Sequence, residues 1–143
     1  AGAIIWALAN ICAGGESLLQ QCAGFLEPLG RLMGMDGVIL LAFILGLPAN
    51  EIVLPVALMI YTAQGSLAPI GGLESLCAVL RANGWTPLTA LCVIIFTLLH
   101  WPCSTTLLTI KKESGSLAWT AVAAALPTLF GVILCMLVKL IFK

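Results

Sequence analysis

Hydrophobic residues fill long runs of this chain, and short polar stretches separate the runs. A helix needs roughly 20 apolar residues to cross a hydrocarbon core about 30 Å thick. Three runs meet that length: residues 37–62, 87–110 and 117–142. A shorter apolar run, residues 1–12, would reach only about 18 Å as a helix. We interpret it as the end of a further transmembrane helix that begins upstream.

Two other segments alternate apolar and polar residues with helical spacing. Between residues 16 and 33, the apolar residues recur at intervals of three and four, and a second, shorter segment at residues 73–80 does the same. Ser17 followed by Gln20 suits a capping box, and Asn83-Gly84 suits the end of the second helix. These patterns predict two amphipathic helices, and we place the first of them at the membrane interface or in a re-entrant position.

Prolines interrupt the first two long runs near their centres. Pro48 and Pro55 lie in GLPANEIVLP, and Pro102 lies in LLHWPCSTT. A proline removes one backbone N–H and displaces the carbonyl four residues earlier. Unpaired backbone groups cost several kcal/mol in lipid. We therefore predict a discontinuous helix in each run, and either run could cross the membrane or return as a hairpin to its starting side.

Composition places the chain in a bilayer. Of its 143 residues, 62% are hydrophobic and 8% are charged, far from the composition of soluble domains. The predicted fold is all-α: one membrane domain, residues 1–143, built as a helical bundle with two proline-interrupted transmembrane segments and two amphipathic helices. Six basic residues are dispersed among six acidic ones, which excludes a nucleic-acid interface. If all three runs cross, three basic residues fall on each side, so the charges do not fix the orientation.

The second interrupted run carries the strongest candidate chemistry. Paired, interrupted spans in transporters mark a midplane site at which unwound carbonyls coordinate cations. His100 and Cys103 combine imidazole with thiolate, which suit Fe²⁺, Zn²⁺ and copper. We favour Cys103 as a transient metal ligand. His100 has an equally good structural role, as a hydrogen-bonded histidine in the bundle core or near the interface.

The first interrupted run carries Asn50 and Glu51. A carboxylate in mid-membrane is costly, so such residues face a cavity, pair with a cation or bind ions. Both residues are candidates for the path of a metal ion. The structural alternatives are a protonated Glu51 that bonds the broken turn, and Asn50 as the N-cap of the helix that follows.

An enzyme is the other interpretation of His100 and Cys103, since the imidazole could take the thiol proton. The sequence supplies no third residue to orient them, and no G-x-S-x-G, H-E-x-x-H or P-loop motif. We therefore predict a protein that is not an enzyme, holds no tightly bound cofactor and does not itself bind nucleotide through a P-loop.

Three stretches together resemble a known family: GVILLAFILGLPANEIVLP, GWTPLTALCVIIFTLLHWPCSTTLLTIKKESGS and the closing hydrophobic helix. They are similar to the C-terminal membrane (gate) region of the bacterial ferrous iron transporters of the FeoB family, over essentially the whole chain. The resemblance implies passage of Fe²⁺ across the bacterial inner membrane through a gate lined by Cys103. His100, Glu51 and Asn50 are weaker candidates.

The resemblance also implies partners. A G-protein domain and a first gate motif would lie upstream of Ala1 in the same parent chain, GTP hydrolysis would be coupled to transport, and a homo-oligomer is left open. Two alternatives stand beside this hypothesis. One is a gate-type transporter of an organic solute, and the other is a structural membrane bundle that supports a partner protein.

Overall fold

The structure, a computed structural model, describes residues 5, 7, 10–13, 16–48, 50–62 and 72–142; for residues 12, 13, 16 and 50 it describes the backbone alone. Its elements in chain order are β1 (Cys12–Ala13), β2 (Glu16–Ser17), α2 (Leu18–Leu32), α3 (Gly37–Leu45), the 3-10 turn η1 (Asn50–Ile52), α4 (Val53–Tyr61), α5 (Leu73–Ala82), α6 (Pro87–Leu99), α7 (Ser104–Ser114) and α8 (Leu117–Ile141). The predicted all-helical class is confirmed. The two-residue pair β1–β2 is an addition that the sequence did not predict.

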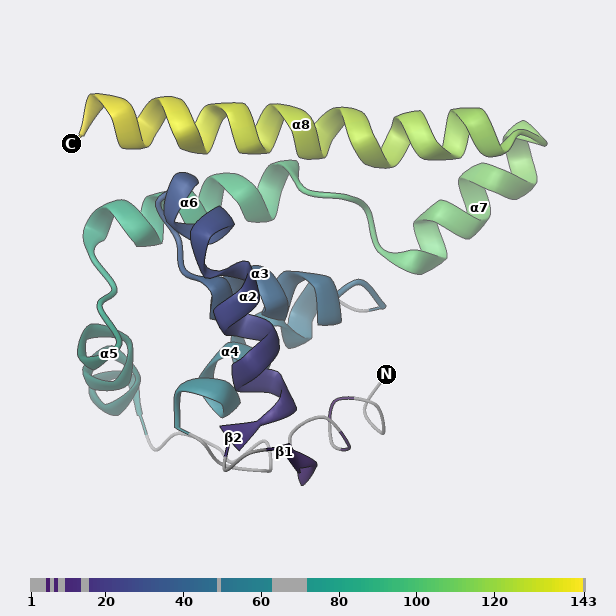
Figure 1. The fold of residues 1–143 in the computed structure, drawn as a ribbon. Helices are drawn as coiled ribbons and strands as arrows, with labels where there is room; N and C mark the ends of the chain where they lie inside the picture. The colour runs from purple at the N-terminus through teal and green to yellow at the C-terminus, as the bar shows by residue number, and fades with distance from the viewer. Residues whose placement is uncertain are drawn as a thin grey trace.

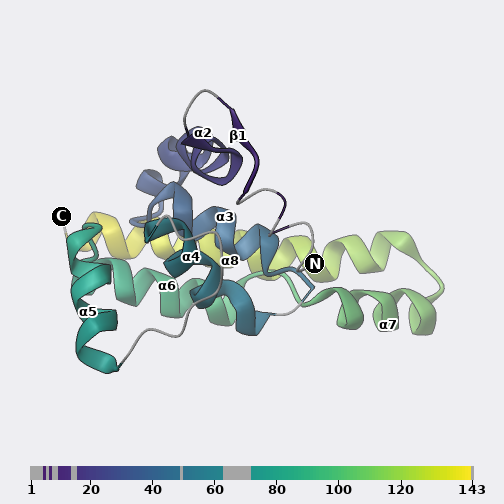
Figure 2. The same ribbon diagram turned by 90° about the horizontal axis from the view of Figure 1, so that it is seen from below.

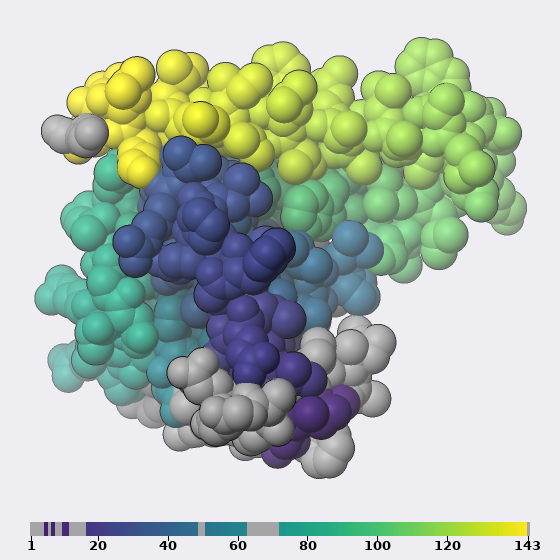
Figure 3. Space-filling view, in the orientation of Figure 1, coloured from purple at the N-terminus to yellow at the C-terminus, as the bar shows by residue number. Residues whose placement is uncertain are grey.

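Apart from α5, the helices form two groups. Helix α8 lies along α6 and α7, while α2, α3 and α4 pack against one side of them (Figure 1). The turned view shows α2 standing away from the α6–α8 layer (Figure 2). The space-filling view shows the end formed by α7 and α8 projecting beyond the rest of the molecule (Figure 3).

Helix α2 is the first predicted amphipathic helix. Ser17 and Gln20 form the expected capping box at its start. Its axis turns by 109° into α3, and the two helices cross at two glycines. A Cβ on Gly37 would lie 2.0 Å from the Ala23 carbonyl oxygen, and one on Gly30 would lie 2.5 Å from the Asp36 carbonyl carbon. The close crossing therefore requires glycine at both positions.

The first interrupted run folds as two short antiparallel helices. Helix α3 ends at Leu45, and after a turn and η1 the chain resumes as α4, with nine residues in each helix. At the turn, a Cβ on Gly46 would meet Cγ2 of Val53 at 2.5 Å. At the opposite end, the Tyr61 hydroxyl donates to the Asp36 carboxylate. The two outer ends of this run therefore lie side by side.

The second interrupted run begins as predicted. The Thr86 side chain accepts from the Thr89 N–H, and Pro87 is the first helical residue of α6. The helix stops at Leu99, residues 100–103 belong to no helix or strand, and α7 follows. Together, Pro87–Ser114 is long and apolar enough to cross a membrane, and so is Leu117–Ile141.

Helices α6 and α8 pack closely in an antiparallel pair. A Cβ on Gly131 would lie 3.1 Å from the Leu99 Cβ. Farther along, the Cys135 thiol donates to the Cys92 carbonyl oxygen at 3.4 Å, and both cysteines are fully buried. Near the end of α8, the Lys139 amine donates to the Arg31 carbonyl oxygen. This bond ties the C-terminal end of α8 to the last turn of α2.

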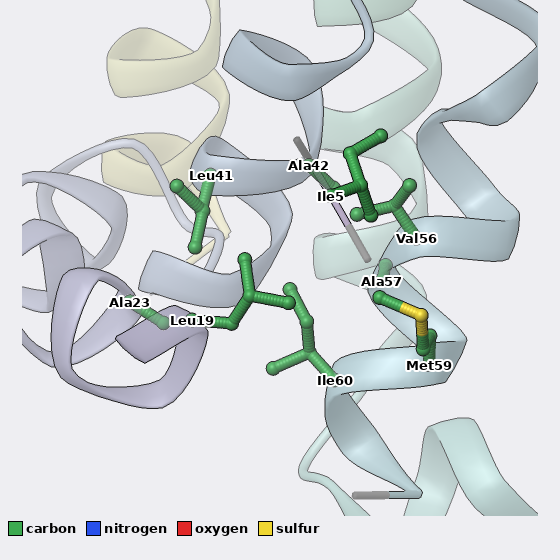
Figure 4. Packing of buried hydrophobic residues seen from close by; sticks show 9 residues of the cluster. All are labelled: Ile5, Leu19, Ala23, Leu41, Ala42, Val56, Ala57, Met59 and Ile60. Carbon is green, nitrogen blue, oxygen red and sulfur yellow. The ribbon is translucent and has the colours of Figure 1, made fainter. Parts of the chain in front are cut away.

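Buried apolar side chains form two clusters. One joins α2, α3 and α4 through Leu19, Ala23, Leu41, Ala42, Val56, Ala57, Met59 and Ile60, with Ile5 (Figure 4). The other joins α3, α6 and α8 through Ile39, Leu40, Phe43, Cys92, Phe96 and Cys135, with Met33 and Met35. Helix α3 belongs to both clusters and contributes a continuous set of buried residues. It is therefore the central element of the fold.

Of the predicted run at residues 1–12, the structure describes residues 5, 7 and 10–12. The assignment of residues 37–62, 87–110 and 117–142 as membrane crossings, and of residues 1–143 as one domain, stays a prediction. The interruptions within the first two runs are confirmed.

Candidate functional site

The two interruptions lie against each other. The Ser104 backbone N–H donates to the Leu47 carbonyl oxygen at 3.0 Å, and the Ser104 hydroxyl donates to the same oxygen at 3.2 Å. Leu47 immediately precedes the first proline, and Ser104 is the first residue of α7. A carbonyl freed by one break is therefore satisfied by two donors from the other. This joint between Leu47 and Ser104 was not predicted from the sequence.

His100 ends α6 and caps it. Its ring Nδ1 lies 3.1 Å from the Phe96 carbonyl oxygen and 2.9 Å from that of Thr97. Because a carbonyl oxygen can only accept, Nδ1 carries a hydrogen. The ring thereby satisfies a carbonyl that would otherwise bond the next turn of a continuous helix. This is the structural role that the sequence offered for His100.

The other ring nitrogen of His100 has no such partner. The residue is 7% exposed, and its Nε2, like the Trp101 Nε1, is buried without a hydrogen bond in the part of the chain that the structure describes. With Nδ1 protonated, Nε2 of a neutral ring presents a lone pair. A histidine that ligates a metal is held in the same way, with its second nitrogen bonded to a carbonyl. The capping role and a ligand role are therefore compatible.

Aromatic rings surround this histidine. The ring centroids of Phe43 and His100 are 5.1 Å apart, those of Phe96 and His100 are 5.9 Å apart, and those of His100 and Trp101 are 5.8 Å apart. Phe43 comes from α3, so the first run helps to enclose the cap of the second. The phenylalanines read as ordinary core residues in the sequence, and no local signal marks them as neighbours of His100.

Cys103 is the residue from which α7 restarts. Its backbone is extended, as an N-cap requires. Its Sγ lies 3.1 Å from the Thr105 hydroxyl and 3.2 Å from the Thr106 hydroxyl. The residue is partly exposed, unlike the fully buried Cys92 and Cys135. The site thus combines an accessible sulfur with two hydroxyl oxygens, all from one turn of the chain.

The first break presents Glu51 in the 3-10 turn, where the residue is exposed. The side chain of Asn50 lies outside the described part of the structure. Among the described residues, no group of three His, Cys, Asp or Glu side chains is placed to hold a metal ion. A closed structural metal site would want four ligands, whereas a passing ion needs weak and incomplete coordination. The assignment of Cys103, His100, Glu51 and Asn50 to the path of a metal ion therefore stays a prediction.

An apolar groove of about 690 Å³ borders the joint between the two breaks. Leu47 and Trp101 form part of its wall, and Leu107 from α7 lies close by. Helix α8 also lines the groove, through Ala121, Ala124, Ala125, Thr128, Leu129 and Val132. The groove offers hardly any polar groups.

Comparison with known proteins shows the family to which the chain belongs. The family model named Gate, described as nucleoside recognition, matches residues 1–117. The chain belongs to the Gate family. It is 31% identical over 134 residues to the Fe(2+) transporter FeoB of Staphylococcus aureus (strain COL), a match that covers 87% of this chain and 18% of the relative.

Two further relatives carry the same name. The Fe(2+) transporter FeoB of Synechocystis is 29% identical over 127 residues, covering 87% of this chain and 19% of the relative. That of Leptospira biflexa is 31% identical over 113 residues, covering 74% of this chain and 16% of the relative. The Gate chain thus spans less than a fifth of the length of these relatives. No solved structure matches it. The relatives and the two long apolar helices identify it as membrane-embedded.

Proposed function

We propose that this Gate chain is part of a ferrous iron permease and that Fe²⁺ passes Cys103 on its way across the bacterial inner membrane. The proposal rests on one observation above the others. Cys103 stands where α7 restarts, next to Ser104, which binds Leu47 of the other break. The relatives named as Fe(2+) transporters support iron as the cargo.

The chemistry of the joint suits a soft divalent cation in transit. A thiolate and hydroxyl oxygens can replace part of the water shell of Fe²⁺ without enclosing the ion. Cys103 with Thr105 and Thr106 supplies such a set. His100 Nε2, Glu51 and Asn50 are the further donors along the same path. Coupling to GTP hydrolysis would come from a G-protein domain in the parent protein, since this sequence contains no P-loop motif.

The proposal is tested by uptake of radioactive Fe²⁺ into cells that express the full-length parent protein. We expect Cys103→Ser to reduce uptake several-fold, because a hydroxyl is a poorer ligand for Fe²⁺ than a thiolate. Cys77→Ser is the matched control, since Cys77 is exposed on α5, away from the joint, and should leave uptake unchanged. Normal uptake by the Cys103 variant at normal protein level would remove Cys103 from the path.

An organic solute is the alternative cargo, which the description of the family as nucleoside recognition favours. The groove beside the joint argues against a nucleoside, because its wall has few groups to bond a base or a ribose. Uptake of a labelled nucleoside that Fe²⁺ does not inhibit, together with no uptake of Fe²⁺, would favour the alternative.

A further inference from the structure

The outer ends of the first interrupted run meet at one place in the fold. Asp36 precedes α3, and Tyr61 is the last residue of α4, yet their side chains are hydrogen-bonded. The Trp85 indole N–H donates to the same Tyr61 hydroxyl at 2.9 Å, just before α6 begins. The start of α3, the end of α4 and the start of α6 therefore lie together.

The C-terminal end of α8 lies at the same end of the molecule. Lys139 bonds the Arg31 carbonyl oxygen, and a Cβ on Gly34 would touch the Lys139 side chain at 3.6 Å. The turn at Gly115, between α7 and α8, lies at the far end of α8 (Figure 1). If α8 crosses the membrane, Asp36, Tyr61 and Trp85 are on one side and Gly115 is on the other.

The tip of the first run reaches the middle of the second. Leu47 bonds Ser104, and Phe43 packs on His100, whereas the candidate span of the second run extends from Pro87 to Ser114. Each nine-residue helix of the first run is about 13 Å long, which is less than half of a hydrocarbon core about 30 Å thick. Two such helices, folded back on each other, reach mid-membrane and return.

We propose that residues 37–62 form a re-entrant hairpin, which enters and leaves the membrane on the same side and carries the PANE turn to the depth of the second break. The alternative, a crossing, would separate Asp36 from Tyr61 by about the thickness of the hydrocarbon core. The hairpin also explains why α2, which is amphipathic, meets α3 at 109°: α2 then runs along the surface from which the hairpin enters.

The hairpin changes the charge count. Arg31, Arg81, Lys139 and Lys143 then share one side, and Lys111 and Lys112 share the other. Four basic residues against two place the first side in the cytoplasm by the positive-inside rule. With three crossings, three basic residues fell on each side of the membrane and the orientation stayed open. The hairpin removes this tie.

Labelling with a membrane-impermeant maleimide in intact and permeabilised cells tests the proposal. Single cysteines are introduced into the full-length protein by Arg31→Cys, Glu74→Cys and Glu113→Cys, all at exposed positions, and each is compared with the protein that lacks the introduced cysteine. We expect Glu113→Cys to be labelled in intact cells, and the other two only after permeabilisation. Labelling of Arg31→Cys and Glu113→Cys from one side, with Glu74→Cys on the other, would overturn the hairpin.

A second measurement checks the contact directly. In Asp36→Cys/Tyr61→Cys, a short bismaleimide should link the two introduced thiols within one chain, and mass spectrometry of the digested protein would detect the link. The pair Asp36→Cys/Glu113→Cys, whose members belong to opposite ends, should not be linked. Failure to link the first pair in a normally folded protein would contradict the hairpin. Neither measurement depends on iron transport, so the hairpin and the proposed cargo can fail separately.

Discussion

At the scale of single residues, the two ring nitrogens of His100 differ in their surroundings. Nδ1 bonds the carbonyls at the end of α6, while Nε2 is buried without a partner among the described residues. The sequence offered a structural hydrogen bond and metal binding as alternative interpretations of His100. In the structure they concern different atoms of one ring, so each can be tested without the other.

Two substitutions separate these roles. His100→Asn keeps an N–H donor near the position of Nδ1 and should lower the free energy of unfolding by less than about 1 kcal/mol, whereas His100→Leu should lower it by about 1–3 kcal/mol because the Thr97 carbonyl loses its partner. Unfolding of the purified protein in detergent gives both values. Equal losses for the two variants would contradict the capping role.

Measurements of Fe²⁺ uptake test the proposed ligand role of His100. His100→Asn has no nitrogen at the position of Nε2, so we expect lower Fe²⁺ uptake at nearly normal stability if our proposal for the path is correct. Normal uptake would leave His100 as a cap alone.

At the scale of elements, α2 and α3 can cross closely because Gly30 and Gly37 have no side chains. The Gly37 N–H donates to the Glu27 carboxylate at 2.8 Å, and the same carboxylate forms an ion pair with Arg31 at 2.7 Å. The ion pair joins residues four apart on one helix, a spacing at which side chains are neighbours. The bond to Gly37 joins two helices and needed the tertiary structure.

Gly37→Ala should therefore be strongly destabilising. The new Cβ would lie 2.0 Å from the Ala23 carbonyl oxygen and 2.7 Å from the Glu27 nitrogen, so backbone must shift, and we expect a loss of more than about 2 kcal/mol in detergent unfolding. Gly24→Ala is the matched control in α2, because no atom lies within 4 Å of its added Cβ. It should gain up to about 1 kcal/mol from helix propensity. Similar effects of the two substitutions would disprove the close crossing.

At the scale of the whole molecule, the joint between Ser104 and Leu47 ties the hairpin to the second run. It is the point at which two breaks, 57 residues apart in sequence, become one site. The aromatic contacts of His100 with Phe43 strengthen the same connection. A change at the joint should therefore loosen the hairpin as a whole.

Ser104→Pro removes both donors to Leu47, and we expect it to cost about 1–3 kcal/mol, against about 0.5–1.5 kcal/mol for Ser104→Ala, which keeps the N–H. Proline is well tolerated at the first residue of a helix, so the loss reports the joint. Leu117→Pro, at the first residue of α8, is the matched control and should change stability little. Equal losses for Ser104→Pro and Leu117→Pro would show that the joint contributes nothing.

The sequence by itself determined the class of fold and the positions of the main helix ends and breaks. Ser17 caps α2 as predicted, Asp36 and Thr86 cap α3 and α6 through their own side chains, and the helices stop at the two proline motifs. These features depend on hydrophobic pattern, capping and proline, which act within one turn of helix. Tertiary structure alone decided which ends meet: Asp36 with Tyr61, Leu47 with Ser104, and Arg31 with Lys139. A crossing and a hairpin have the same local pattern, and the contact between Asp36 and Tyr61, which only the tertiary structure provides, is what favours the hairpin.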